Sequence, residues 1–99
     1  MFRWIVSQKR VKQVIKNFNL MLKTDPYFSN RFYVKQLRKS YEEHVYYFIF
    51  RIYDNLTKTH RDTPWVADYS FNKEGKYFPR EAFNIFNNFI ISKLHNIDL

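Results

Sequence analysis

The sequence lacks cysteine altogether and holds only one glycine and three prolines among its 99 residues. Without cysteine, disulfides, thiolate zinc sites and cysteine nucleophiles are excluded. The single glycine, Gly75, excludes the glycine-rich loops that hold nucleotide phosphates. Long apolar runs are lacking too: the longest spans residues 45–50 and ends at Arg51, well short of the roughly 18 to 20 residues that cross a bilayer. These absences remove several enzyme classes and predict no membrane span.

Tracts rich in glycine, serine or proline are missing as well, so the composition indicates no linker. With 45% apolar and 21% aromatic residues, the chain is typical of a globular protein. We therefore expect a single small basic domain over residues 1–99. The first residues form no signal peptide, which favours an intracellular protein, cytoplasmic or organellar. Abundant Lys, Asn, Ile, Phe and Tyr with little Gly or Ala indicate an AT-rich genome, such as that of a phage, another mobile element, a low-GC bacterium or an organelle.

Charge is unevenly distributed along the chain, whose net charge is +8. Residues 1–39 hold ten basic side chains and one acidic one, Asp25, whereas residues 40–99 hold seven basic and eight acidic ones. One face or end should therefore carry a positive potential that attracts polyanions or an acidic partner.

The first segment predicts an amphipathic helix from about Val6 to Lys23. Its apolar residues fall on one side of a helical wheel: Val11, Val14, Ile15, Phe18, Met21 and Leu22. Lys9, Lys12, Lys16 and Lys23 gather roughly 135° away and form a basic stripe. Asp25-Pro26 should end the helix, because the residue before proline is pushed out of the helical region.

Residues 27–44 allow two interpretations. As a helix, they would place Val34, Leu37 and Tyr41 on one face. As strands, Phe32-Tyr33-Val34 would pair with the aromatic run that follows. Alternation between apolar and polar residues is poor from Lys35 to Glu43, which favours a helix there.

The run Val45–Tyr53 should lie in the middle of the core, and its β-branched and aromatic residues favour a strand, although a buried helix would look similar. We expect it to pair with a second strand at about residues 65–71, across a polar loop over Asp54–Pro64. A turn around Gly75 and a final helix at about residues 79–95 would follow. The predicted fold is α+β, with an all-α three-helix bundle as the alternative.

The basic residues of the first 39 positions are the candidate binding site, because lysines at this spacing can neutralise backbone phosphates without reading bases. The candidate set comprises these residues except Arg3: Lys9, Arg10, Lys12, Lys16, Lys23, Arg31, Lys35, Arg38 and Lys39. Four aromatic residues are interleaved with the later cations: Tyr27, Phe28, Phe32 and Tyr33. Such rings can stack on unpaired bases, although they more often belong to the core.

Other polar residues point to ordinary structural roles. Arg51 interrupts an apolar run, so it either extends to solvent at the sheet edge, pairs with an acid such as Asp54 or Asp68, or points at a ligand. An ion pair is its expected role. The histidines, at positions 44, 60 and 95, lack the spacing of a helical metal site. His60 and the aspartates near it are explained by local turn hydrogen bonds. We therefore expect no enzyme activity, metal, cofactor or small-molecule substrate.

If residues 32–36 form a strand, the order becomes helix, three strands, helix, which resembles that of the double-stranded-RNA-binding domain. That family opens its last helix with a basic cluster, whereas this chain has the nearly neutral Pro79-Arg80-Glu81-Ala82-Phe83 there. The resemblance is one of element order, and we carry over no site residue.

A second pattern lies between Met21 and His44: Met21-Leu22-Lys23, Phe28-Ser29, Arg31-Phe32-Tyr33-Val34, Leu37-Arg38 and Tyr41. It is similar to the first helices of the mitochondrial LYR proteins, which are small basic three-helix accessory factors. Asn17-Phe18-Asn19 stands here in place of the Leu-Tyr-Arg signature.

Together these features predict a non-enzymatic module that binds DNA or RNA through backbone phosphates. The alternative is a small protein–protein interaction factor, such as a phage inhibitor or an accessory subunit, that docks on an acidic partner. Exposed aromatic residues such as Trp4, Tyr47 or Trp65 would distinguish this alternative.

Overall fold

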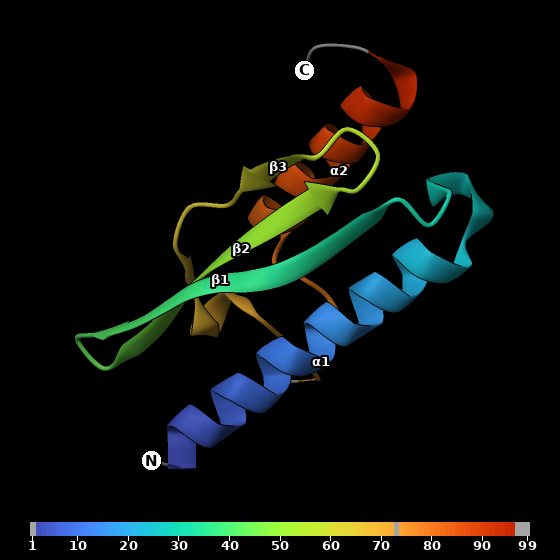
Figure 1. The fold of residues 1–99 in the computed structure, drawn as a ribbon. Helices are drawn as coiled ribbons and strands as arrows, with labels where there is room; N and C mark the ends of the chain where they lie inside the picture. Colours follow the sequence, from blue (N-terminus) through green and yellow to red (C-terminus); the bar gives the residue numbers. More distant parts are fainter. Residues whose placement is uncertain (1, 73, 97–99) are drawn as a thin grey trace.

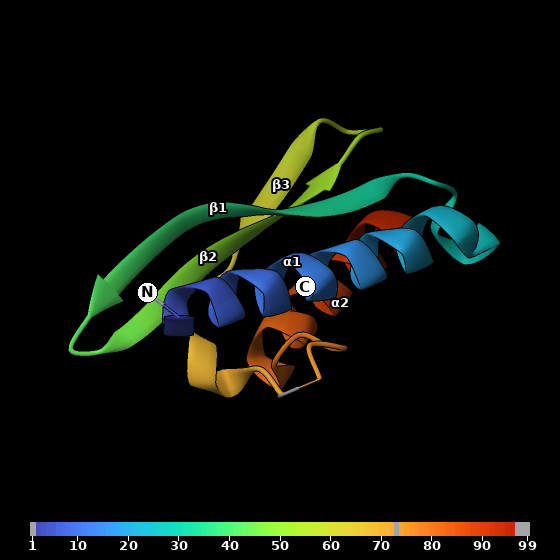
Figure 2. The ribbon, with the colours of Figure 1, turned by 90° about the horizontal axis from the view of Figure 1, so that it is seen from below.

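The chain folds into an antiparallel sheet with two helices on one of its faces (Figures 1 and 2). The computed structural model describes residues 2–72 and 74–96, with side chains from residue 8 onward. The elements in chain order are α1 (Phe2–Thr24), η1 (Pro26–Phe28), β1 (Phe32–Glu42), β2 (Val45–Asp54), β3 (Thr59–Asp62), β4 (Val66–Ala67), η2 (Asp68–Ser70) and α2 (Arg80–His95). The α+β prediction is therefore confirmed, and the all-α alternative, including the three-helix resemblance, is wrong.

Strand β1 corrects the preference for a helix over Lys35–Glu43. It pairs antiparallel with β2, and the register shifts between Gln36 and Arg38. Leu37 is thus an extra residue, a β-bulge, and side chains on either side of it alternate in opposite phase. This change of phase is why the alternation test failed on a real strand.

The turn between β1 and β2 consists of two residues, Glu43 and His44, with φ of 50° and 67°. Two consecutive positive φ values are those of a type I′ hairpin turn, whose twist matches that of the strands. Neither residue is the glycine or asparagine that usually marks this turn, so the sequence carried no hairpin signal here.

The far edge of β2 is shared by β3 and β4. The β3 register continues through Thr63, whose N–H donates to the Phe50 carbonyl at 2.9 Å, and whose hydroxyl accepts from the Phe50 N–H at 3.1 Å. Pro64 and Trp65 then interrupt the ladder before β4. The predicted partner strand at residues 65–71 is therefore only partly correct, because pairing there is limited to Val66–Ala67 and the predicted loop contains β3. Counting β3 and β4 as one interrupted strand, the order helix, three strands, helix is observed.

The core lies between the sheet and the two helices. Strand β2 contributes Phe48, Phe50 and Ile52, which are completely buried. Helix α1 adds Val11, Val14 and Leu22, and α2 adds Ala82, Phe86, Phe89 and Ile90. The expected central position of Val45–Tyr53 is confirmed for this face alone, because the residues that alternate with the buried ones are only half-buried.

Both helices end where the sequence predicted. Helix α1 ends at Thr24, and α2 ends at His95. The Asp25 carboxylate accepts a hydrogen bond from the Tyr27 N–H at 3.0 Å and so caps the short helix η1. Gly75 adopts the expected positive φ of 62° in the loop before α2. Within α2, Phe83 was expected on the buried face but is 44% exposed.

Asn19 joins α1 to the free edge of the sheet. Strand β1 is an edge strand, so the N–H and C=O of Val34 that point away from β2 need other partners. The Asn19 amide supplies both: its Nδ2 donates to the Val34 carbonyl at 2.8 Å, and its Oδ1 accepts from the Val34 N–H at 2.7 Å. This double hydrogen bond fixes the rotation of α1 about its own axis relative to β1.

We predict that Asn19→Ala lowers the free energy of unfolding by about 1 to 3 kcal/mol, because two backbone groups at a buried residue lose their partners. Asn17→Ala is the matched control on the same helix, since the Asn17 amide makes one exposed hydrogen bond, from Gln13 at 2.8 Å, and should cost less than about 0.5 kcal/mol. Urea unfolding of both variants measures the difference. Equal losses would mean that Asn19 does not anchor α1.

Candidate nucleic-acid interface

The basic stripe of α1 lies on the flank of the helix that borders β1. All four stripe lysines, Lys9, Lys12, Lys16 and Lys23, are exposed. On a helical wheel they fall within roughly 80° of Asn19, and Asn19 is bonded to the edge of β1. The α1 stripe therefore runs beside the free edge of the sheet.

Two basic residues of β1 lie on the sheet face that points away from the helices. Lys35 is directly opposite Arg51, and Arg38 is directly opposite Ile49. These β2 residues alternate with the buried ones, and directly paired residues share a face. Lys35 and Arg38 are both exposed, so the edge of β1 has the α1 stripe on one side and these two cations on the other.

The other predicted cations are separated from this surface. Lys39 is paired with buried Phe48 and is therefore directed to the helix side of the sheet. Arg10 lies on the opposite flank of α1 and packs against Gly75, where an added Cβ would be 3.0 Å from the Arg10 Cγ.

Arg31 is held in a structural ion pair with Asp54. Its Nε and Nη2 donate to the two carboxylate oxygens at 2.7 and 2.8 Å, and the Asp54 side chain is completely buried. Burial alone would raise the pKa of Asp54, but hydrogen bonds from Arg31, the Thr57 hydroxyl and the Leu56 N–H together lower it to about 2. Arg31 thus compensates a buried charge and is a poor candidate for a phosphate contact.

Arg51 has a different partner from those expected. It donates to both oxygens of Asp62 at 2.6 and 3.0 Å, because the β2–β3 register places the two residues directly opposite each other. The hydrogen bonds from Arg51 lower the pKa of Asp62. The prediction that Arg51 pairs with an acid is confirmed, but the two examples named, Asp54 and Asp68, are wrong, because the partner lies on β3 and the sequence did not predict that strand.

Aromatic residues accompany the cations on the open face of the sheet. The rings of Tyr33 and Tyr53 are stacked, with centroids 4.7 Å apart, and the Lys35 Nζ lies 5.7 Å from the Tyr53 ring. The Arg38 guanidinium lies 5.6 Å from the centroid of Trp65. The sequence does not mark Tyr53 as a surface residue, because Tyr53 belongs to a nearly continuous apolar run that predicts a core strand. Side chains alternate between the two faces of a strand, and the β1–β2 register places Tyr53 directly opposite Tyr33.

Of the four aromatic residues interleaved with the cations, only Tyr33 joins them on the open face. Phe32 is buried in the core and Phe28 packs against it. Tyr27 is exposed in η1, where its hydroxyl is 3.3 Å from the His95 Nε2. Trp4 lies outside the described side chains.

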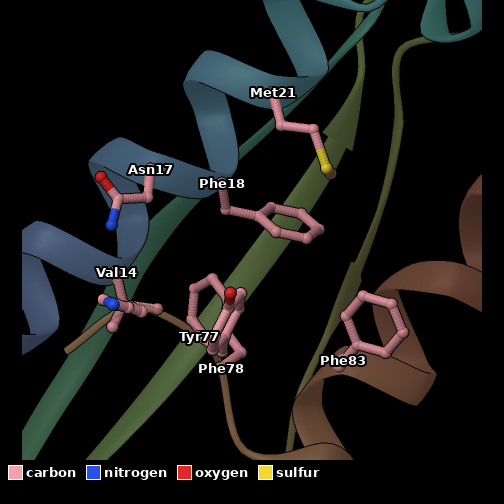
Figure 3. A pocket seen from close by; sticks show the side chains of 8 residues that line it. Val14, Asn17, Phe18, Met21, Tyr77, Phe78 and Phe83 are labelled. Carbon is pink, nitrogen blue, oxygen red and sulfur yellow. The ribbon is translucent and has the colours of Figure 1, made fainter. Parts of the chain in front are cut away.

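A groove opens on the opposite flank of α1 (Figure 3). Its volume is about 440 Å³, and it lies between α1 and the segment that leads into α2. Its lining is Val14, Asn17, Phe18, Met21, Lys76, Tyr77, Phe78 and Phe83. Tyr77 is 70% exposed, so this apolar surface is accessible from solvent.

Within residues 2–72 and 74–96, no three His, Asp or Glu side chains are grouped as a metal site would require. Neither helix in these ranges has the length and hydropathy of a membrane span. Comparison of the chain with models of protein families, with curated proteins and with solved structures finds no match.

The low pKa of Asp54 makes stability depend on pH. Because the pKa is about 2 in the folded protein against 3.8 for a free aspartate, the ionised carboxylate stabilises the fold above about pH 4, and we predict that about 2 kcal/mol is lost as the pH falls from 4 to 2. Asp54→Asn should remove most of this dependence and should destabilise the protein by about 3 kcal/mol at pH 7. Urea unfolding at each pH measures both effects.

Asp62→Asn is the matched control, since it breaks a similar two-point pair with an arginine at an exposed position. Its cost at neutral pH should be much smaller than that of Asp54→Asn, because water screens and solvates the exposed partners. Equal costs would show that burial of the Arg31–Asp54 pair is unimportant.

Proposed function

We propose that the protein is a non-enzymatic module that binds nucleic acid through its phosphate backbone. The observation that carries this proposal is the position of six exposed cations on both sides of one sheet edge: Lys9, Lys12, Lys16, Lys23, Lys35 and Arg38. Within the described part of the chain, none of the six forms an ion pair with a carboxylate. Their charges are therefore available to an external polyanion.

The dimensions of the α1 stripe suit a nucleic-acid backbone. Lys9 and Lys23 are separated along α1 by about 21 Å at 1.5 Å per residue, about the length of six base pairs of duplex. Because the stripe holds lysines rather than bidentate arginines, it favours contacts to phosphates over readout of base edges. We expect binding that depends strongly on salt and weakly on sequence.

The proposal predicts that a plot of log affinity against log salt concentration has a slope of about −3 to −5, since each phosphate contact contributes about −0.7 to −0.9. Lys12→Gln/Lys16→Gln should reduce the magnitude of the slope by about 1 to 2 and weaken binding. Fluorescence anisotropy with labelled oligonucleotides at about 50 to 200 mM salt measures both quantities.

Lys76→Gln/Arg80→Gln is the control, because it removes the same charge from exposed positions near the start of α2. The control should leave the slope nearly unchanged. Absence of binding at about 50 mM salt, or an affinity independent of salt, would refute the proposal.

The apolar groove favours a second candidate function, the docking of an acidic protein segment. The groove lining contains Lys76 and no carboxylate, and the protein carries a net charge of +8. A partner that places an apolar side chain between Tyr77 and Phe83 and directs an acidic residue to Lys76, in place of the exposed Glu74 that pairs with it at 3.2 Å, would match this surface.

We predict that, if this second function holds, Phe83→Asp abolishes binding to a purified partner while Lys12→Gln/Lys16→Gln preserves it. Phe83 is suited to this test because its side chain is partly exposed and points into the groove (Figure 3). Calorimetric titration of the partner into each variant measures the effect. The reverse pattern would exclude the groove as the docking site.

A further inference from the structure

One face of the sheet is left uncovered by the fold. Figure 2 shows α1 and α2 together beneath the sheet, and no described element lies over its other side. The face of a sheet that meets solvent normally carries polar residues. This face instead presents mostly aromatic and apolar residues along β1, β2 and the segment before β4: Tyr33, Tyr47, Ile49, Tyr53 and Trp65. Core packing does not explain these rings.

Tyr33 is placed to extend a stack outward from the sheet. One face of its ring lies against Tyr53, with centroids 4.7 Å apart and the planes tilted by only 14°. Because β1 is the edge strand, the other face of the ring is directed beyond the sheet edge, and Tyr33 is 37% exposed. A flat group entering from that side would continue the Tyr53–Tyr33 stack.

Trp65 forms a second exposed ring on the same face. It is 43% exposed, and it borders a hollow lined by Ser40, Glu42 and Tyr47. Arg38 is directly opposite Ile49, and Ile49 lies four residues before Tyr53 on β2. The Arg38–Trp65 pair is therefore about 13 Å along the strand from the Tyr33–Tyr53 stack. The face therefore carries two separate stacking positions, each with a cation beside it.

The charges on this face indicate where a phosphate backbone would pass. Asp62 holds Arg51 in a two-point ion pair, and Glu42 lies at the hairpin end of the face. Among the described residues of this face, the cations without a carboxylate partner are Lys35 and Arg38, both on the edge strand next to the α1 stripe. Phosphates would therefore follow the edge of β1, and the attached bases would extend inward over the rings.

We propose that this open sheet face binds single-stranded nucleic acid by stacking unpaired bases on Tyr33 and Trp65. The inference rests on the proposed function, since the cations of the α1 stripe and β1 supply the phosphate contacts, and it deepens that function by specifying the substrate class. Unpaired bases fit because they offer free ring faces to aromatic side chains, whereas the bases of a duplex are stacked on one another. DNA and RNA share this chemistry.

The test measures binding of oligo(dT) and oligo(U) of about 16 nucleotides and of a duplex of equal length. We expect both single strands to bind at least about tenfold more tightly than the duplex. Tyr33→Val should weaken single-strand binding by about 5- to 100-fold, the usual effect of removing one stacking ring, and should leave duplex binding unchanged. Tyr33→Phe keeps the ring and should retain most of the affinity.

Trp65 provides an independent readout. In a Trp4→Phe background Trp65 is the only tryptophan, and its fluorescence should be quenched by the single strands and not by the duplex. Trp65→Leu tests the second stacking position if Tyr33→Val fails to fold. Tyr77→Val, which removes an exposed ring from the groove flank, is the control and should have no effect on single-strand binding.

The outcomes separate the two proposals. Equal affinity for single strands and duplex, together with unchanged binding by Tyr33→Val and Trp65→Leu, would overturn the stacking inference while leaving phosphate binding intact. Absence of binding to any of these nucleic acids at about 50 mM salt would overturn both. Tighter binding of either single strand than of the duplex, reduced by Tyr33→Val, would support the inference.

Discussion

The complete burial of one side of β2 is the constraint on which the rest of the structure depends. Phe48, Phe50 and Ile52 need two helices to cover them, and both helices lie on the same side of the sheet (Figure 2). Because side chains alternate along a strand and both helices cover the same side, the residues that alternate with these three lie on the side that no helix covers. The open face with its tyrosines follows directly from the way in which the core is built.

The bulge at Leu37 determines which cations reach that open face. If Leu37 were an ordinary residue of the ladder and alternation ran unbroken through it, Arg38 would share the helix side with Gln36, and Lys39 would share the open side with Lys35. The shift exchanges them, so that Lys35 and Arg38 lie together and Lys39 is directed toward the helices. A single irregularity in the ladder thereby selects the composition of the candidate interface.

The basic side chains divide into structural and available groups. Arg31 and Arg51 each make a two-point ion pair with an aspartate, one buried and one exposed. These pairs tie the residue before β1, and strand β3, to β2, and they neutralise Asp54 and Asp62. The α1 stripe, Lys35 and Arg38 are left beside the β1 edge, where the double hydrogen bond of Asn19 holds the helix next to the strand. The candidate interface is thus built from cations that form no ion pair with a carboxylate among the described residues.

The sequence by itself determined the local features: the amphipathic α1 with its stripe, its end before Pro26, the strand character of Val45–Tyr53, and α2. Each of these depends on a periodicity or a backbone restriction contained within a few turns of chain. Only the tertiary structure decided β1, β3 and the composition of the surface. The bulge at Leu37 broke the alternation, the Glu43-His44 turn lacked a glycine, and the polar Thr59–Asp62 had no apolar pattern to reveal it. Which cations are paired and which are available depends on strand register, and register is a relation between segments that no single segment encodes.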